Sequence, residues 1–524
     1  MNSHQDTDSF TAHVARQLAE APDHVAVIDG ARRMTRAQLF DEARCIGSAL
    51  VRLGLRKGAA IAFQLPNWHE ACVVNLAAAL YGFRLVPLLP MYREAEISFI
   101  LGECDVEAIF LPAHFRGVAY PDLFSRAQAA SVPASQVFIV RGEDPRYATY
   151  AGLLQGAQPF AQPLLAPAPA HSKVVKTVLY TSGSTGRPKG VMHSDRSICA
   201  LIRFAQEFWG LTESDVALVP SPVGHIGGSM YAFELPWIAG LTAVLMDVWS
   251  PERAIELMEA ERVSFCAGAT PFLAGLVKAA VAKDTRLPSL RRFICGGASV
   301  PSSLIQQASS QFVHCTVSRA YGSTEVPLVS PGIRSRADAS FGATTDGECA
   351  ADVQILADDG TPVAPGESGE IVARAPRMFM RYINPEDNAS ALTADGYFRM
   401  GDVGRLVAGK FIEITGRKKD IIIRMGENIS PLEIENALAE HAAIKQVAIV
   451  GIPDARTGEA ALAFVVLNEG AQFSLKDMTE FLSQRGLARQ KFPEHLRVVA
   501  SLPTNSVGKV LKRELQALAA SEEK

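Results

Sequence analysis

The sequence lacks the cysteine patterns that build disulfide frameworks or zinc sites. Its eight cysteines are scattered, no two stand in C-x-x-C spacing, and none follows Cys349. Such frameworks and metal sites need cysteines at short, regular spacings. We therefore expect reduced cysteines packed in an apolar core.

The sequence also has little excess charge and no long uninterrupted apolar run. Its 51 basic and 55 acidic residues leave a formal net charge of −4, which argues against a nucleic-acid partner. Residues 71–90 are the most apolar stretch, but Asn75, Arg84 and two prolines interrupt it, so we expect no membrane span. The polar first residues lack a secretory core and the last four carry no peroxisomal address, which predicts a cytoplasmic protein.

Strand-like apolar runs alternate with stretches of helical periodicity through the first part of the chain. Residues 68–81 predict a helix, with Cys72, Leu76 and Leu80 on one stripe. Strands are predicted around it and later, at residues 59–65, 85–88, 108–111 and 137–140. This β-α-β succession predicts a largely parallel sheet covered by helices. Residues 151–172, rich in Ala, Pro and Gln, predict a surface connection.

A second kind of pattern surrounds Gly416. Short alternating strands are predicted before it, at residues 353–356, 369–373, 405–406 and 410–414. A compact unit of about a hundred residues follows, with strands predicted at 421–424, 446–451 and 461–466 and helices at 431–441 and 475–484. The expected fold class is therefore α/β. A large N-terminal domain, residues 1–416, combines βαβ-type sheets with a small β-barrel-like part, and a small α+β C-terminal domain spans residues 417–524.

The most informative segment is Y-T-S-G-S-T-G-R-P-K-G, residues 180–190, after strand-like residues 174–179. Glycines let the backbone turn tightly and approach a ligand closely. Hydroxyls and loop amides can donate to phosphate oxygens, and Lys189 adds a positive charge. The segment is not the P-loop of nucleotide hydrolases, because Pro188 stands where that motif needs glycine and Gly190 follows Lys189 instead of Ser or Thr. Taken alone, the run is also compatible with a flexible Ser/Gly loop.

This segment closely resembles the signature loop of the adenylate-forming superfamily. That superfamily includes acyl-CoA synthetases, aryl-acid ligases, peptide-synthetase adenylation domains and firefly-type luciferases. Four further motifs typical of it follow in the expected order: Y-G-S-T-E at 321–325, Gly401-Asp402, Gly416-Arg417, and P-T-N-S-V-G-K at 503–509. The resemblance covers essentially the whole chain. It implies an enzyme that activates a carboxylic acid with ATP and Mg²⁺ and then forms a thioester with coenzyme A.

The resemblance also implies the roles of residues in an ATP site. Tyr321 offers an aromatic face to adenine, Thr324 donates to the α-phosphate, and Glu325 binds Mg²⁺. Asp402 accepts hydrogen bonds from the ribose and Arg417 adds a second ribose contact, whereas Met400 stands where the family usually has threonine. The implied ATP-binding residues are Thr181, Ser182, Gly183, Ser184, Thr185, Gly186, Lys189, Gly297, Ala298, Tyr321, Gly322, Thr324, Asp402, Arg417 and Lys509.

Lys509 matches the catalytic lysine of the family. A substrate carboxylate is already ionised at neutral pH, so no general base is needed. The difficulty is to bring an anion against the α-phosphate, and Lys509, Lys189 and Mg²⁺ would neutralise the charge that builds up there. The implied catalytic residues are Lys509, Thr324, Glu325 and His225. Without the motifs, Lys509 is an ordinary solvated lysine and Glu325 a surface acid.

The resemblance assigns three further sets of residues. His225, in P-S-P-V-G-H-I-G-G at 220–228, borders the acyl pocket; we hypothesise that it orients the carboxylate and then moves aside, the alternative being a packed histidine. Lys419 is the hinge about which the mobile C-terminal domain rotates between the two half-reactions. The implied acyl pocket comprises His225, Ile226, Ser229, Met230, Gly268 and Ala269, and the implied CoA tunnel comprises Arg424, Gly426 and Glu427, with Met425 replacing one customary glycine.

The acid substrate is predicted only as a class. Residues 65–68 and 90–96 look most like the medium-chain fatty acid and cyclohexanecarboxylate ligases. Dihydroxybenzoate ligases tend to have asparagine where this chain has Ile226, which disfavours a hydroxyl-reading pocket. We expect a small alicyclic, aromatic or short-to-medium-chain acid. A stand-alone enzyme that loads an acyl or aryl carrier protein and an inactive acyl-nucleotide-binding protein are alternatives, and a homodimer is left open.

Overall fold

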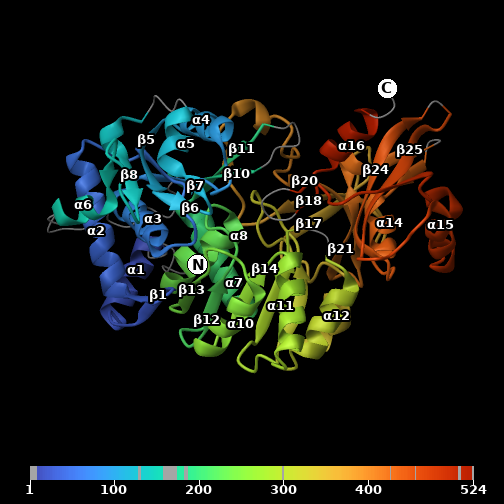
Figure 1. Ribbon diagram of the computed structural model, residues 1–524, viewed down its shortest axis with the longest axis horizontal. Helices are drawn as coiled ribbons and strands as arrows, with labels where there is room; N and C mark the ends of the chain where they lie inside the picture. Colours follow the sequence, from blue (N-terminus) through green and yellow to red (C-terminus); the bar gives the residue numbers. More distant parts are fainter. Residues whose placement is uncertain are drawn as a thin grey trace.

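The computed structural model describes residues 9–127, 132–156, 174–181, 187–297, 300–424, 427–454, 456–504 and 509–521. Two mostly parallel sheets with their helices form a large body, and a smaller unit lies at one end of the molecule (Figure 1). None of the helices in these residues is both long and apolar enough to cross a bilayer.

The first sheet, seven-stranded within the described residues, carries much of the candidate site. All neighbouring strands run parallel except the last pair. Its order is β16 (Thr316–Ala320), β15 (Arg292–Gly296), β14 (Phe265–Gly268), β12 (Val216–Val219), β13 (Thr242–Leu245), β1 (Val25–Asp29) and β2 (Arg32–Thr35).

The second sheet, eight-stranded within the described residues, is parallel except at one edge, where β10, β11 and β19 pair antiparallel. Its order is β19 (Arg381–Tyr382), β11 (Lys189–Ser194), β10 (Val175–Thr181), β4 (Arg84–Pro87), β3 (Ala60–Phe63), β5 (Val106–Pro112), β8 (Val137–Val140) and β9 (Ala148–Thr149). Strands β6 (His114–Phe115) and β7 (Val118–Ala119) form a separate hairpin.

The helices of the large body form three layers, one between the two sheets and one on each outer face. Strand β3 shows why: Ile61 and Phe63 pack into the central layer, whereas Ala60 and Ala62 face the outer layer. The central layer holds α1 (Phe10–Glu20), α2 (Arg36–Arg52), α3 (His69–Tyr81), α7 (Asp195–Trp209), α8 (Ile226–Ser229) and α9 (Leu235–Ile238). The outer helices are α4 (Glu94–Glu103) and α5 (Tyr120–Arg126) on the second sheet, and α10 (Pro251–Ala260), α11 (Thr270–Ala282) and α12 (Ser302–Gln311) on the first. Helix α3 is apolar all round and buried almost throughout, as its central position requires.

A four-stranded antiparallel sheet stands where the small β-barrel-like part was expected. It consists of β17 (Asp352–Leu356), β18 (Gly369–Arg374), β20 (Phe398–Val407) and β21 (Phe411–Arg417), with the short helix α13 (Ala339–Thr344) before it. The C-terminal unit follows directly. Its sheet contains β23 (Glu427–Ile429), β22 (Ile422–Arg424), β25 (Gly458–Leu467), β24 (Ile444–Asp454) and β26 (His495–Val498), packed with α14 (Pro431–Leu438), α15 (Leu475–Gln484) and α16 (Lys512–Ser521).

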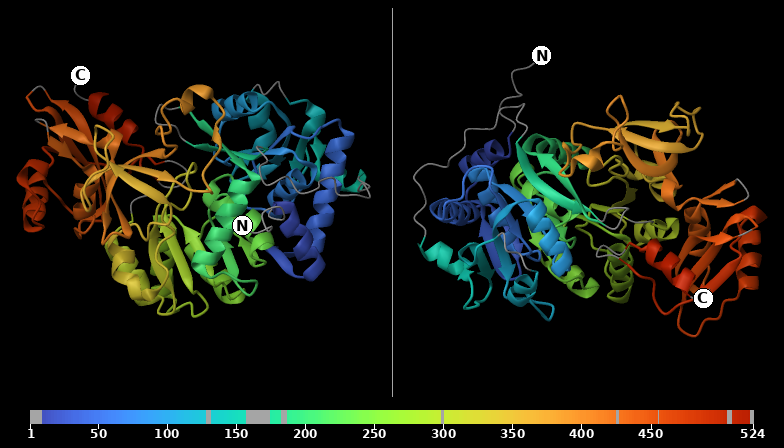
Figure 2. Two further views of the ribbon diagram at one scale, coloured as in Figure 1. Left: turned by 180° about the vertical axis from the view of Figure 1, so that it is seen from behind. Right: turned by 90° about the horizontal axis from the view of Figure 1, so that it is seen from above.

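The two added views show helix α16 on the side of the C-terminal unit that faces the large body (Figure 2). The expected α/β class, with a large sheet-bearing part and a small C-terminal unit, is confirmed. The expected surface connection at residues 151–172 is partly wrong, because it begins inside helix α6 (Tyr150–Gly156). Residues 157–172 lie outside the described residues.

Candidate active site

Asp402 is the centre of a charged corner that joins three of the sequence motifs. Antiparallel pairing places Asp402 of β20 opposite Arg417 of β21. Arg417 Nε lies 3.0 Å from Asp402 Oδ1, and the Tyr321 hydroxyl donates to Oδ2 at 2.8 Å. Asp402 is only 5% exposed, and a buried carboxylate needs such partners. The structure thus brings together Tyr321, Asp402 and Arg417, three residues that the resemblance assigns to the ATP site.

Lys509 lies at the same corner. The pKa of its ammonium is lowered to about 8, mainly by burial. The charges of Arg417 and Lys419 lower it further, while those of Asp402 and Asp420 raise it. Lys419, the predicted hinge residue, belongs to the turn Lys418–Asp420 directly after β21, and burial also lowers its pKa. The C-terminal unit is therefore seen in an arrangement that brings its lysine to the large body. Residues 505–508 of the same motif lie outside the described residues.

The Thr324–Glu325 turn follows β16 and is held by neighbours from two other segments. His193 Nε2 donates to the Thr324 carbonyl at 2.7 Å, and the Phe379 amide donates to the Glu325 carbonyl at 2.7 Å. The Tyr382 hydroxyl donates to Glu325 Oε1 at 2.6 Å. Burial lowers the pKa of His193 to about 4, so the imidazole is a neutral donor at physiological pH. Burial and the charge of Glu325 raise the pKa of Tyr382, which keeps its hydroxyl protonated.

The β10–β11 hairpin frames the predicted phosphate loop. Thr181 ends β10 and pairs with Lys189, the first residue of β11. Lys189 Nζ lies 2.8 Å from Asp387 Oδ1 and 5.2 Å from the centre of the Tyr382 ring. Ser182, Gly183, Ser184, Thr185 and Gly186 lie outside the described residues.

Gly297, one of the predicted ATP-binding residues, follows β15 and leaves the first sheet beside Tyr321. Strands β15 and β16 are parallel neighbours, so Gly297 and Tyr321 emerge at the same edge. Gly297 has φ +85°, a left-handed conformation that favours glycine. A Cβ at Gly322 would lie 2.7 Å from the Leu328 backbone nitrogen, so this turn also requires glycine. Ala298 lies outside the described residues.

The predicted acyl-pocket residues gather at the ends of two further neighbouring strands, β12 and β14. His225 caps helix α8, and its Nδ1 accepts the Gly227 amide at 3.1 Å, while burial lowers its pKa. Ile226, Ser229 and Met230 in and just after α8 are buried. Gly268 ends β14 and Ala269 caps α11.

Asn67, which sequence reasoning did not single out, fixes the loop that carries His225. Its amide nitrogen donates to the carbonyls of Val219 and Ser221 at 3.0 and 2.9 Å, and also to that of Met246 at 3.0 Å. Its oxygen accepts the Val223 amide at 2.9 Å. Because Asn67 follows β3 of the second sheet, it ties that sheet to the end of β12. His193, Tyr382 and Asp387 were missed in the same way, since none stands in a motif.

The side chain of Arg424, predicted to line the CoA tunnel, makes its described contacts away from the Asp402 corner. Arg424 Nη2 lies 2.5 Å from Glu494, and Nη1 donates to the Gln490 carbonyl at 2.8 Å, both inside the C-terminal unit. Glu427 is the first residue of β23, and Gly426 lies outside the described residues.

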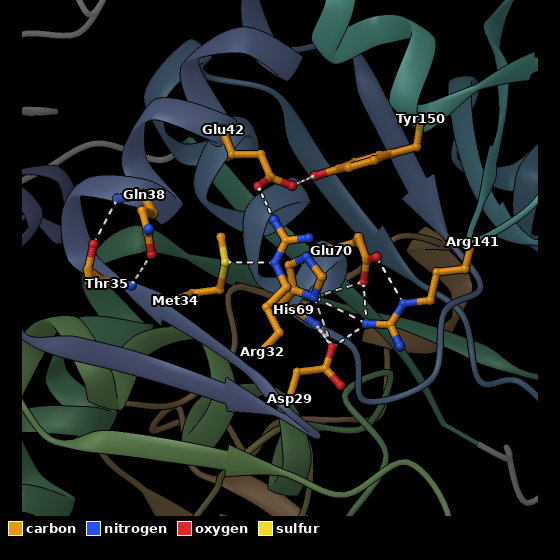
Figure 3. Close-up of polar contacts among 10 residues, drawn as sticks. All are labelled: Asp29, Arg32, Met34, Thr35, Gln38, Glu42, His69, Glu70, Arg141 and Tyr150. Atoms are coloured by element: carbon orange, nitrogen blue, oxygen red, sulfur yellow. Dashed lines mark hydrogen bonds and ion pairs between the residues drawn. The ribbon is translucent and has the colours of Figure 1, made fainter.

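Among the described residues, Asp29, His69 and Glu70 are the one group of three side chains close enough to share a metal ion. Arg141 already occupies the space between them (Figure 3). Its Nη2 contacts Asp29 and lies 2.8 Å from Glu70 Oε2, and its Nε lies 2.9 Å from Glu70 Oε1. The guanidinium also lies 4.2 Å from the centre of the Trp68 ring. This cluster binds the two sheets together, because β1 belongs to one sheet and α3 follows a strand of the other.

Comparison with known proteins adds family relationships to this geometry. A family model described as AMP-binding enzyme matches residues 14–383, and one described as AMP-binding enzyme C-terminal domain matches residues 433–509. The medium-chain fatty-acid–CoA ligase of Escherichia coli K12 is 35% identical over 515 residues, covering 96% of this chain and 89% of that protein.

A second relative acts on a different named acid. The 3-[(3aS,4S,7aS)-7a-methyl-1,5-dioxo-octahydro-1H-inden-4-yl]propanoyl:CoA ligase of Rhodococcus jostii RHA1 is 31% identical over 520 residues, covering 97% of this chain and 98% of that protein. The crystal structure of ATP-bound MatB from Rhodopseudomonas palustris has a TM-score of 0.85 at 24% identity, covering 98% of this chain and 99% of that one. At this identity the likeness establishes the fold.

Proposed function

The chain belongs to the AMP-binding enzyme family, as an AMP-forming acyl-CoA synthetase, and from that premise we propose that it couples a small carboxylic acid to coenzyme A in two half-reactions. In the first, a carboxylate oxygen bonds to the α-phosphorus of ATP and pyrophosphate leaves. In the second, the thiol of coenzyme A loses its proton, its sulfur bonds to the acyl carbon, and AMP leaves.

The observation that carries this proposal is the meeting of Lys509 with Asp402 and Arg417. The lysine comes from the last motif of the chain and its partners from two others. A cation held where burial and like charges depress its pKa gains most from an approaching anion. In the proposed first step, negative charge gathers on the oxygens of the substrate carboxylate and of the α-phosphate. The Lys509 ammonium offsets this charge without giving up its proton.

The residues around Glu325 fit a magnesium ion. Mg²⁺ is usually held by one or two carboxylates together with substrate phosphates, and Glu325 is a nearly buried carboxylate with one oxygen fixed by Tyr382. Bound there, the ion would supply positive charge against the triphosphate. Thr324 would donate to the α-phosphate, Lys189 to the outer phosphates together with the loop at Thr181, and Asp402 and Arg417 would bind the ribose.

The geometry of His225 supports its proposed place at the acyl carboxylate. Because Nδ1 accepts the Gly227 amide, the proton of the neutral imidazole is on Nε2. Nε2 can therefore donate to a carboxylate oxygen in the first half-reaction. The second half-reaction needs room for the thiol, and rotation of residues 417–524 about Lys419 is the proposed way to provide it.

We propose a small alicyclic, aromatic or short-to-medium-chain acid as the substrate. The two relatives described above are named for a medium-chain fatty acid and for a propanoate on a bicyclic ring, which supports an apolar acyl group. Ile226, Met230, Gly268 and Ala269 are apolar or small, as such a group requires. Both relatives are named CoA ligases, which supports coenzyme A over a carrier protein as acceptor.

A panel of carboxylic acids with ATP and Mg²⁺ tests the proposal. We expect acid-dependent release of pyrophosphate, formation of AMP, and acyl-CoA by mass spectrometry when CoA is added. A parallel series with purified carrier proteins should show no loading. Formation of ADP and phosphate, or pyrophosphate release that no acid stimulates, would contradict the proposal.

A further inference from the structure

Tyr382 lies between two charged residues that the proposed function places on the nucleotide. Its hydroxyl donates to Glu325 Oε1 at 2.6 Å, and its ring centre lies 5.2 Å from Lys189 Nζ. Only 5% of the residue is exposed. One side chain therefore contacts both the candidate metal carboxylate and the candidate phosphate cation.

The backbone around Tyr382 is fixed to the strand that carries Lys189. Strand β19 pairs antiparallel with β11, with Tyr382 opposite Val191. The Met380 amide donates to the Met192 carbonyl at 2.8 Å, and the Ile383 amide donates to the Gly190 carbonyl at 2.9 Å. Any shift of Tyr382 relative to Lys189 would have to break this pairing.

The same segment also fixes the carboxylate. The Phe379 amide holds the Glu325 carbonyl at 2.7 Å, while the Tyr382 hydroxyl holds one side-chain oxygen. Within the described part of the chain, Oε2 of Glu325 has no hydrogen-bond partner. The carboxylate thus keeps a fixed orientation with its second oxygen available to a cation.

The ring has a separate role beside Lys189. An ammonium within about 6 Å of a ring centre is attracted by the aromatic face. Asp387 completes this arrangement: its Oδ1 lies 2.8 Å from Lys189 Nζ, and it belongs to the turn Pro385–Asn388 that follows β19. The Asn388 side chain accepts the Tyr382 amide at 2.9 Å and so ties this turn to the strand. The ring and Asp387 thus fix the position of the Lys189 ammonium beside the strand that carries Tyr382.

We propose, resting on the proposed function, that Tyr382 is a positioning residue that sets Glu325 and Lys189 at the separation a magnesium–triphosphate needs. Its hydroxyl orients the carboxylate for the metal, and its ring supports the ammonium for the phosphates. These two contributions can be removed one at a time.

Tyr382→Phe removes only the hydroxyl. A hydrogen bond to a charged group is worth enough to change a binding constant about tenfold. We expect the Mg²⁺ concentration that half-saturates binding of α,β-methylene-ATP, measured by calorimetry without acid, to rise about tenfold. The KM for the acid should stay unchanged. Tyr382→Leu removes the ring as well and should weaken analogue binding about threefold further, including binding without Mg²⁺.

Tyr397→Phe is the matched control. The Tyr397 hydroxyl donates to Asp352 Oδ2 at 2.8 Å, and the residue is also nearly buried, but it contacts neither Glu325 nor Lys189. In this variant the Mg²⁺ concentration that half-saturates analogue binding should equal that of the parent protein. Thermal melting of each variant confirms that the fold is retained.

A double-variant cycle distinguishes positioning from general support. In the Glu325→Gln background, Tyr382→Phe should no longer change the Mg²⁺ requirement, because the hydroxyl acts through that carboxylate. An unchanged Mg²⁺ requirement in Tyr382→Phe, or an equal change in Tyr397→Phe, would overturn the proposal. If the parent protein itself shows no Mg²⁺-dependent analogue binding, the proposed function fails, which is a separate result.

Discussion

Two partly buried clusters, each with an aspartate, an arginine and an aromatic ring, differ in their electrostatics. In the first, Arg141 lies between Asp29 and Glu70 (Figure 3). Its guanidinium also lies over the Trp68 ring. In the second, Arg417 and Tyr321 hold Asp402, and Lys509 is added to them.

The two clusters differ in the direction in which the pKa of their cation is shifted, Arg141 in the first and Lys509 in the second. Burial lowers the pKa of Arg141, but Glu70 and Asp29 outweigh it and leave the pKa raised. Burial together with Arg417 and Lys419 lowers that of Lys509 to about 8. In the first cluster the carboxylates outweigh the burial of the cation, whereas in the second cluster burial and the neighbouring cations outweigh the carboxylates. A group of metal-ligating residues is therefore a weaker guide to function than a cation with a depressed pKa.

The largest effect that tests this contrast is expected from Lys509→Ala. Loss of a charge that acts in the transition state typically costs roughly 10²–10³-fold in rate. We expect that loss in pyrophosphate exchange, with little change in thioester formation from preformed acyl-AMP. Lys476→Ala, at an ammonium that is 81% exposed, is the control. Equal losses in both half-reactions would remove Lys509 from its assigned step.

Arg141→Met is expected to affect stability instead of chemistry. It removes the guanidinium that pairs with both Asp29 and Glu70 and leaves His69 as their remaining partner in the cluster. This should lower the free energy of unfolding by about 3 kcal/mol, or roughly 10²-fold in the folding equilibrium. Denaturant unfolding measures this, and kcat and KM of the folded enzyme should stay as in the parent. Arg405→Met breaks the exposed pair with Glu413 and should cost under about 1 kcal/mol.

The pH dependence of unfolding in acid gives a second test of the stabilising role of the Arg141 cluster. Burial raises the pKa of Asp29, but hydrogen bonds from His69 and Arg141 outweigh it and leave the pKa lowered. The Asp29 contribution is therefore present above its unfolded value of 3.8 and is lost as pH falls through the lower folded value. Arg141→Met should flatten this acid dependence. A large loss of activity without a loss of stability would reverse the assignment of the cluster.

Asp402→Asn is expected to raise the KM for ATP about tenfold, because a neutral amide cannot replace the carboxylate as acceptor for ribose hydroxyls and as partner of Arg417. The KM for the acid should be nearly unchanged. Asp352→Asn, at an exposed pair with Arg374, is the control. An unchanged apparent affinity for ATP would exclude the ribose contact.

The smallest effect is a pH dependence. Because the pKa of Lys509 is about 8, its protonated fraction falls about threefold between pH 7.5 and 8.5. We expect kcat/KM for adenylation to fall by the same factor. Its folded pKa is below the unfolded 10.5, so stability rises with pH between these values while activity falls. Lys509→Arg keeps its charge and should lose this alkaline limb. A parent profile flat to pH 9 would contradict the depressed pKa.

Local patterns were sufficient for several elements of regular structure but not for all of them. The predicted strand at residues 137–140 and helix at 475–484 coincide with β8 and α15, because apolar periodicity acts over a few neighbouring residues. The predicted helix at 431–441 ends earlier, at Leu438. The ends of helices are harder to predict than their middles, because the last turn often frays. The helical start of residues 151–172 was missed, since its Ala, Gly and Gln content resembles that of a connection.

The sequence by itself determined the order of the motifs, the α/β class and the residue types that a nucleotide site needs, because these depend on local spacing and composition. Only the tertiary structure decided which partners those residues have. Tyr382 reaches Glu325 across 57 residues, and His193 reaches Thr324 across 131. Such contacts arise when strands distant in the chain pack side by side, and no spacing along the sequence encodes the 2.6 Å between a hydroxyl and a carboxylate.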